Sequence, residues 1–181
     1  MSRAAVAVVV TALTFAARAL AGWTRTAPPA EARFNGSGPG GFKLAGKTAA
    51  VDVKDDGKAL TVVVALKDLS TGIALRDTHM RDKYLEVQKY PETTLSLPLA
   101  ALTIPVDGKD GEGDVKGNVT LHGVTKEQAV HYKASCKAGV CDVTGTLPLD
   151  MHDYGIHVPA YLGITVKPLV NITVTFQAKR P

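Results

Sequence analysis

The segment Ile164-Thr-Val-Lys-Pro-Leu-Val-Asn-Ile-Thr-Val-Thr-Phe-Gln-Ala178 alternates between apolar and polar side chains almost without a break. One parity carries Ile164, Val166, Val170, Ile172, Val174, Phe176 and Ala178. Successive side chains of a strand point to opposite faces, so the segment predicts a long strand with one buried and one solvated face. An antiparallel sheet with one buried face must curl, form a sandwich or close on itself to cover that face.

The same alternation recurs upstream of this segment. It is found in residues 42–53, 60–66, 95–101, 115–121 and in two runs around residues 136 and 141. The parity of the first run changes near Gly46, which predicts a bulge or bend. Residues 23–33 are expected to form an extended lead-in, 34–41 a glycine-rich bend and 107–114 a charged loop. The pattern predicts about eight strands, mostly connected by hairpins.

The apolar period changes after Leu69. Ser70 or Thr71 can cap a short helix, and Ile73, Asp77, Met80 and Tyr84 follow at helical spacing. Tyr90-Pro91 ends this segment, because a proline disfavours helix at the residue before it. The sequence therefore predicts one helical insertion in an otherwise all-β chain.

The two cysteines, Cys136 and Cys141, lie between two alternating runs, which predicts a hairpin with a four-residue loop. Strand parity lets both thiols face the same side, opposite each other, so we expect a disulfide that serves as a structural staple. A redox role would favour a C-x-x-C motif at a helix start, and the sequence has no such motif.

The first 21 residues are typical of a secretory signal peptide. Arg3 precedes the apolar run from Ala4 to Ala17, which is too short to span a bilayer. Ala19-Leu20-Ala21 resembles a cleavage site, so we expect a cut after Ala21 and a periplasmic or secreted domain at residues 22–181. An uncleaved N-terminal anchor is the alternative.

Charge and motifs exclude several function classes. Without Arg3 and Arg18, 19 basic residues stand against 17 acidic ones, a balance that does not favour a nucleic-acid partner. The glycines at 36, 38 and 41 match a dinucleotide-binding pattern but lack the strand–turn–helix context. The five histidines are scattered, and no catalytic motif occurs. We therefore expect no metal, no cofactor and no catalytic residue.

The densest polar cluster is Arg76-Asp-Thr-His-Met-Arg-Asp-Lys83, on the predicted helix. Arg76 and His79 lie near each other at helical spacing, and with Arg81 they are candidates for binding an anionic headgroup. The alternative is a solvated helix face, in which these cations pair with Asp77, Asp82 or backbone carbonyls and only brace the helix.

Several segments in order resemble the YceI-like family. They are residues 69–72 (LSTG), 76–80 (RDTHM), 84–91 (YLEVQKYP), 121–126 (LHGVTK) and 153–156 (DYGI), followed by the closing strand. This resemblance covers nearly all of residues 22–181. It implies an exported, antiparallel eight-stranded lipocalin-like barrel that is associated with polyisoprenoid or other long amphiphilic lipids, and it implies no shared catalytic residue.

The residues agree with a lipid in the barrel interior. An eight-stranded barrel can be filled by side chains or hold one small ligand, and small aliphatic linings leave room for a slender chain. The predicted lining is Leu60, Val62, Val64, Leu66, Leu95, Leu97, Val119, Leu121, Ile172, Val174 and Phe176. The expected function is transport, storage or sequestration of an isoprenoid or other long-chain lipid. A ligand-free structural or stress-protective barrel, and an enzyme with an unrecognised site, are the alternatives; the oligomeric state is open.

Overall fold

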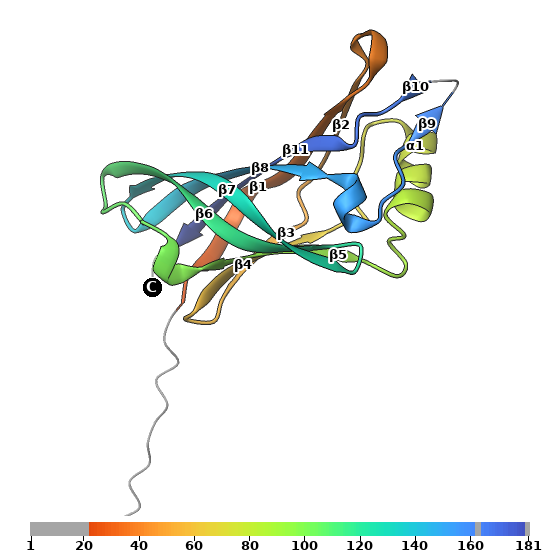
Figure 1. The fold of residues 1–181 in the computed structure, drawn as a ribbon. Helices are drawn as coiled ribbons and strands as arrows, with labels where there is room; N and C mark the ends of the chain where they lie inside the picture. Colours follow the sequence, from red (N-terminus) through yellow and green to blue (C-terminus); the bar gives the residue numbers. More distant parts are fainter. Residues whose placement is uncertain (1–21, 162–163, 180–181) are drawn as a thin grey trace, which may run out of the picture.

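The computed structural model describes residues 22–161 and 164–179 (Figure 1). The predicted signal peptide, residues 1–21, lies outside the described residues. The main sheet is antiparallel and has nine strands in the order β2-β1-β11-β8-β7-β6-β5-β4-β3. These are β1 (Thr24–Ser37), β2 (Lys43–Thr48), β3 (Val51–Asp55), β4 (Ala59–Ala65), β5 (Glu92–Pro98), β6 (Lys109–Leu121), β7 (Val124–Lys137), β8 (Val140–Asp150) and β11 (Leu169–Lys179).

Two short strands and five helical segments complete the described chain. β9 (Ala160–Tyr161) and β10 (Ile164–Thr165) pair only with each other. The α-helix α1 (Ala74–His79) continues into a π-helical turn, η2 (Met80–Tyr84). Single 3₁₀ turns occur at η1 (Pro39–Gly41), η3 (Leu99–Ala101) and η4 (Met151–Tyr154).

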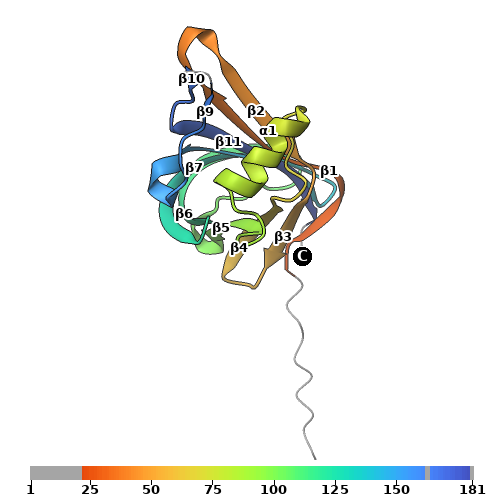
Figure 2. The same cartoon turned by 90° about the vertical axis from the view of Figure 1, so that its right-hand side faces the viewer.

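The main sheet wraps into a nearly closed barrel, seen end-on in Figure 2. Its two edge strands, β2 and β3, follow each other in the chain. We call the line along which these two edges meet the seam of the barrel. On one side of the seam, the Trp23 N–H donates to Asp55 Oδ2 at 2.8 Å. On the other, Lys47 and Ser70 exchange two backbone hydrogen bonds, of 2.8 and 3.0 Å. These links cover the exposed edges that an open sheet would leave.

The expected count of eight strands is wrong, because the run at residues 42–53 forms two strands. β2 pairs with β1, and β3 pairs with β4. The break is a tight corner at Ala49 and Ala50, where the Ala50 N–H donates to Thr48 Oγ1 at 3.1 Å. The parity change therefore marks a change of pairing partner, and Gly46 instead makes room for Phe34, whose ring would lie 2.3 Å from a Cβ there.

Residues 24–37 form the strand β1, where the sequence predicted a lead-in and a bend. Residues 30–35 pair with β11, and residues 32–37 pair with β2. The register against β11 shifts between Arg25 and Ala30, around the prolines at 28 and 29. A bulge tolerates proline because no ladder hydrogen bond is required there, which reconciles these residues with a paired strand.

The predicted strand at residues 164–178 is confirmed from Leu169 onward, as β11, whereas Ile164 and Thr165 form the separate short strand β10. Val170, Val174, Phe176 and Ala178 are buried, and the residues between them are exposed or half-buried. β11 pairs along its whole length with β8, from Leu169 against Asp150 to Lys179 against Val140. Its apolar parity therefore faces the barrel interior.

The turn between β7 and β8 and the start of β6 differ from the prediction. β7 and β8 pair up to Lys137 and Val140, so the turn is Ala138-Gly139, both with positive φ, and not a four-residue loop. Such a two-residue turn matches the twist of the strands it joins. Cys136 and Cys141 lie directly opposite each other and form a disulfide. β6 begins at Lys109, so most of the predicted loop at 107–114 is paired strand.

The predicted helical insertion lies between β4 and β5, and Figure 2 shows α1 across one end of the barrel. Neither Ser70 nor Thr71 caps it; the helix begins after Ile73 without a side-chain cap. Both hydroxyls instead donate to the buried carboxylate of Asp77, at 2.6 Å for Ser70 Oγ. The Thr71 N–H donates to the same carboxylate at 2.7 Å, so Asp77 anchors the helix to the segment that precedes it.

Candidate functional site

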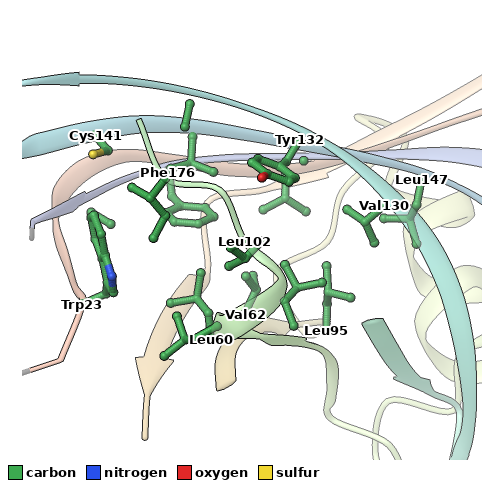
Figure 3. Close-up of a pocket in the computed structure, with 18 residues that line it drawn as sticks. Trp23, Leu60, Val62, Leu95, Leu102, Val130, Tyr132, Cys141, Leu147 and Phe176 are labelled. Atoms are coloured by element: carbon green, nitrogen blue, oxygen red, sulfur yellow. The ribbon is translucent and has the colours of Figure 1, made fainter. Parts of the chain in front are cut away.

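The barrel interior holds two apolar cavities arranged end to end. The larger has a volume of about 510 Å³ and opens toward α1. The smaller, of about 70 Å³, lies further from α1 (Figure 3). Four side chains border both cavities and form a waist between them: Val62, Leu95, Leu147 and Val174. The larger volume lies within the range of roughly 300–1,000 Å³ that is usual for small-molecule sites.

The smaller cavity lies near the disulfide end of the barrel. Figure 3 shows Trp23 and Cys141 at one side of it and Val130 and Leu147 at the other. The hydroxyl of the lining residue Tyr132 accepts from the Thr103 N–H at 2.7 Å and donates to the Thr103 carbonyl at 3.3 Å. Because the backbone satisfies this hydroxyl, the cavity suits an apolar chain end.

All eleven side chains of the predicted lining border one of the two cavities. Leu60, Leu97 and Phe176 line only the smaller one. Val64, Leu66, Val119, Leu121 and Ile172 line only the larger one, and Val62, Leu95 and Val174 belong to the waist. All are buried except Leu95 and Ile172, which are half-buried.

Further wall residues were absent from the predicted lining. Phe34 comes from a segment expected to be a bend and Ile156 from an irregular one. The others were expected on strands or on the helix, but not as lining: Leu44, Met80, Tyr84 and Val166. Strand parity through Ala30, Ala32 and Phe34 was a usable signal for β1. Ile156 follows the 3₁₀ turn η4 in an irregular segment, so no periodicity identifies it.

The cationic candidates separate at the mouth of the larger cavity. Arg76 and His79 line it, whereas Arg81 does not. Arg76 donates from Nε to Thr71 Oγ1 at 2.7 Å and from Nη2 to the Thr71 carbonyl at 2.9 Å. Arg81 donates from Nη1 to the Lys67 carbonyl at 3.0 Å. Arg81 therefore braces the insertion, while Arg76 has both a bracing contact and a place at the mouth.

A buried carboxylate near the mouth, that of Asp77, is held by three hydrogen bonds and is not part of the cavity lining. Burial alone would raise the pKa of Asp77, but the hydrogen bonds from Ser70 and Thr71, together with the attraction of Arg81, lower that pKa below its ordinary value. Asp77 remains ionised and faces its three donors. Within the described part of the chain, neither Nη1 of Arg76 nor the His79 ring makes a hydrogen bond or ion pair.

The other histidines lie apart from the cavity lining. His122 Nε2 is 2.6 Å from Glu86 Oε2, and His131 Nδ1 is 3.0 Å from Asp114 Oδ1. Among residues 22–161 and 164–179, no group of three or more His, Cys, Asp or Glu side chains could hold a metal ion. In the same ranges, no helix combines the length and the apolar composition needed to cross a membrane.

Residues 23–178 match the family model of the YceI-like domain. A curated UPF0312 protein of Pseudomonas syringae pv. tomato is 31% identical over 133 residues, which cover 68% of this chain and 64% of that protein. A UPF0312 protein of Enterobacter sp. is 36% identical over 75 residues, 41% of this chain and 36% of that protein. The chain thus spans less than two thirds of the length of the curated relatives it matches.

Solved structures share the fold. A polyisoprenoid binding domain from Saccharophagus degradans, described as implicated in plant cell wall breakdown, aligns with a TM-score of 0.74 at 20% identity, over 88% of this chain and 98% of that one. Burkholderia cenocepacia BcnA aligns with a TM-score of 0.66 at 15% identity, over 83% of this chain and 96% of that one. At these identities the likeness concerns the fold alone.

Proposed function

This chain belongs to the YceI-like family, and from that premise we propose that it is an exported protein that holds a long polyisoprenoid-like lipid inside its barrel. The observation that carries the proposal is the 510 Å³ apolar cavity with the polar side chains of Arg76 and His79 at its mouth. The name of the Saccharophagus degradans domain supports the class of ligand. We propose a binding role in transport, storage or sequestration, without catalysis.

The energetics favour a chain-like cargo. Each CH₂ group removed from water contributes about 0.8 kcal/mol, so an alkyl or prenyl chain along the barrel axis binds without specific contacts. The small cavity beyond the waist would take the end of the chain. Polar groups at the mouth then select the headgroup, since a few placed polar groups usually orient an otherwise apolar ligand.

The location follows from the sequence and is part of the proposal. Residues 1–21 would direct export and be cut after Ala21, which would place the domain in the periplasm or outside the cell. That compartment is also the one in which the Cys136–Cys141 disulfide persists.

Native mass spectrometry of the gently purified protein tests the cargo directly. We expect a mass shift that disappears on organic extraction, and a prenyl lipid in the extract. The same measurement after adding a polyprenol to the extracted protein should restore a one-to-one complex. A protein that is always empty and also refuses added polyprenol would contradict the proposal.

The headgroup is tested by Arg76→Ala. A guanidinium can bind two phosphate oxygens, and hydrogen bonds to charged groups contribute about 1.5–3 kcal/mol each. We expect the variant to bind a prenyl pyrophosphate about tenfold or more weakly, with a much smaller loss for the matching prenol. Titrations with both lipids measure the difference.

Arg81→Ala is the matched control for this prediction. Arg81 lies on the same insertion but outside the cavity lining, and donates to the Lys67 carbonyl. The Arg81→Ala variant should have a slightly lower melting temperature, and its affinities for the prenyl pyrophosphate and the prenol should change equally little. Equal loss of both lipids in Arg76→Ala, or a fall in melting temperature alone, would leave Arg76 only its bracing contact with Thr71.

A further inference from the structure

Apolar side chains surround the mouth of the larger cavity; two of them, Ile73 and Leu75, face solvent, and the others are half-buried. Ile73 and Leu75 on the insertion are 54% and 63% exposed, and both also line the cavity. Phe42 and Leu44 reach the same mouth from the β1–β2 hairpin, and Pro159 reaches it from the segment before β9. Figure 2 shows α1, β2 and β9 at this end of the barrel. We call these five residues the rim.

The charges beside the rim are mainly positive. The described side chains that line the cavity include Arg33, Arg76 and His79 and no carboxylate. Arg33 and Lys47 share an ion pair with Glu31, and Arg76 is the other lining residue that carries a formal charge. Lys43 is exposed next to Phe42, and the exposed Lys167 donates its backbone N–H to the Ser37 carbonyl at 2.7 Å, beside the end of β1. The exposed Asp82 of the insertion lies outside the cavity lining.

We propose that the rim docks onto the surface of a membrane that contains anionic lipids, and that cargo enters and leaves the barrel there. The proposal rests on the proposed lipid cargo for its purpose, but its physical basis is separate. Exposed apolar side chains flanked by cations are the combination that inserts at the boundary of headgroups and acyl chains. Juxtaposed Lys and Arg side chains are attracted to a negatively charged leaflet.

Continuity between rim and cavity is what distinguishes this surface from other exposed apolar residues. Ile73 and Leu75 belong to the surface and to the cavity wall at once. A lipid chain that left the acyl region of a docked bilayer would pass directly onto apolar wall, so its CH₂ groups would not cross water. An apolar patch without such an opening would give no path for cargo.

Flotation with cargo-free vesicles tests the docking. The wild-type protein should float with vesicles of phosphatidylcholine and phosphatidylglycerol, less with phosphatidylcholine alone, and less again at high ionic strength, because salt screens the attraction. Leu75→Asp should reduce binding to the anionic vesicles about tenfold or more, through lost apolar burial and added negative charge. Ile73→Asp should act in the same direction.

Val106→Asp is the matched control, because Val106 is 64% exposed and lies by the disulfide hairpin, where the Gly108 N–H donates to the Cys136 carbonyl. This variant should float like the wild type. Equal loss in Val106→Asp, no loss in Leu75→Asp, or a wild-type dimer that Leu75→Asp converts to monomer would overturn the proposal.

The proposed function is checked separately on the wild type, with a dissolved short prenol and native mass spectrometry. Uptake of the prenol without flotation on either kind of vesicle would support the proposed lipid binding and contradict membrane docking. Flotation without any uptake of the prenol would support membrane docking and contradict the proposed lipid binding.

Discussion

Replacing Val174 with tryptophan is expected to abolish uptake of a long prenyl lipid. Val174 lies on β11 and is one of the four side chains that form the waist between the two cavities. An indole at this position would fill the waist and project into both spaces. Overpacking a well-packed interior usually costs about 1–3 kcal/mol, so the variant should fold with reduced stability. Native mass spectrometry with added polyprenol measures uptake, and thermal unfolding measures stability.

Asn171→Trp controls for the added indole on the same strand. Asn171 is exposed on the outer face of β11, so this variant should keep both the fold and the uptake. Val64→Trp, on the wall of the larger cavity only, should also block uptake. A folded Val174→Trp protein that still bound one polyprenol at wild-type affinity would place the lipid outside the barrel.

Asp77→Asn should destabilise the protein by roughly 2–3 kcal/mol, the largest stability effect that we expect from a polar substitution here. Asp77 is only 6% exposed, and its carboxylate accepts from the Ser70 hydroxyl, the Thr71 hydroxyl and the Thr71 N–H. An amide has one acceptor oxygen, and its NH₂ group would face donors. The melting temperature should fall by roughly 5–10 °C, as thermal unfolding would show.

The same group predicts how stability depends on pH. The pKa of Asp77 in the folded protein is below its ordinary value of 3.8, because the hydrogen bonds outweigh the effect of burial. The ionised carboxylate therefore contributes stability that is fully present above pH 3.8 and is lost as the pH falls through the lower folded pKa. The unfolding free energy of Asp77→Asn should depend less on pH in this acid range than that of the wild type.

Asp82→Asn is the control for both measurements. Asp82 lies five residues further along the same insertion and is exposed, so its removal should change stability little. A wild-type melting temperature in Asp77→Asn, or an unchanged acid dependence, would mean that the insertion is anchored by its apolar contacts and not by this carboxylate.

The barrel wall could be predicted because its signal is local. Alternation with period two shows which side chains of a strand share a face, whatever the strand pairs with. This is why all eleven predicted lining residues border a cavity, from Leu60 on β4 to Phe176 on β11. The segments that resemble the YceI-like family added the expectation that the strands enclose a lipid.

The number of strands could not be predicted, because it depends on partners that are distant in sequence. β1 pairs with β11, at the other end of the chain, and two prolines in a bulge conceal the strand. The division of residues 42–53 into β2 and β3 depends on the two strands they join, β1 and β4. A single alternating run carries no information about which edge it extends.

In the helical insertion, the sequence likewise did not determine which partners the side chains contact. Sequence spacing brought Arg76 and His79 together and offered Ser70 and Thr71 as caps. Only the folded chain shows that these hydroxyls point to Asp77, that Arg81 turns to the Lys67 carbonyl, and that Leu75 stays exposed at the mouth. When a side chain has several possible partners within reach, the position of the whole helix on the barrel decides which of them it contacts.

The sequence by itself determined an all-β antiparallel chain with one helical insertion, the buried parity of its strands, and the facing positions of Cys136 and Cys141. These features follow from side-chain direction along a strand and from spacing along a helix. Tertiary structure alone decided the near closure of nine strands at the seam between β2 and β3, the waist that divides the interior, and the volumes of about 510 and 70 Å³ on its two sides. The physical reason is that a cavity is the space left after side chains from many strands interdigitate, so its size and opening depend on all of them together.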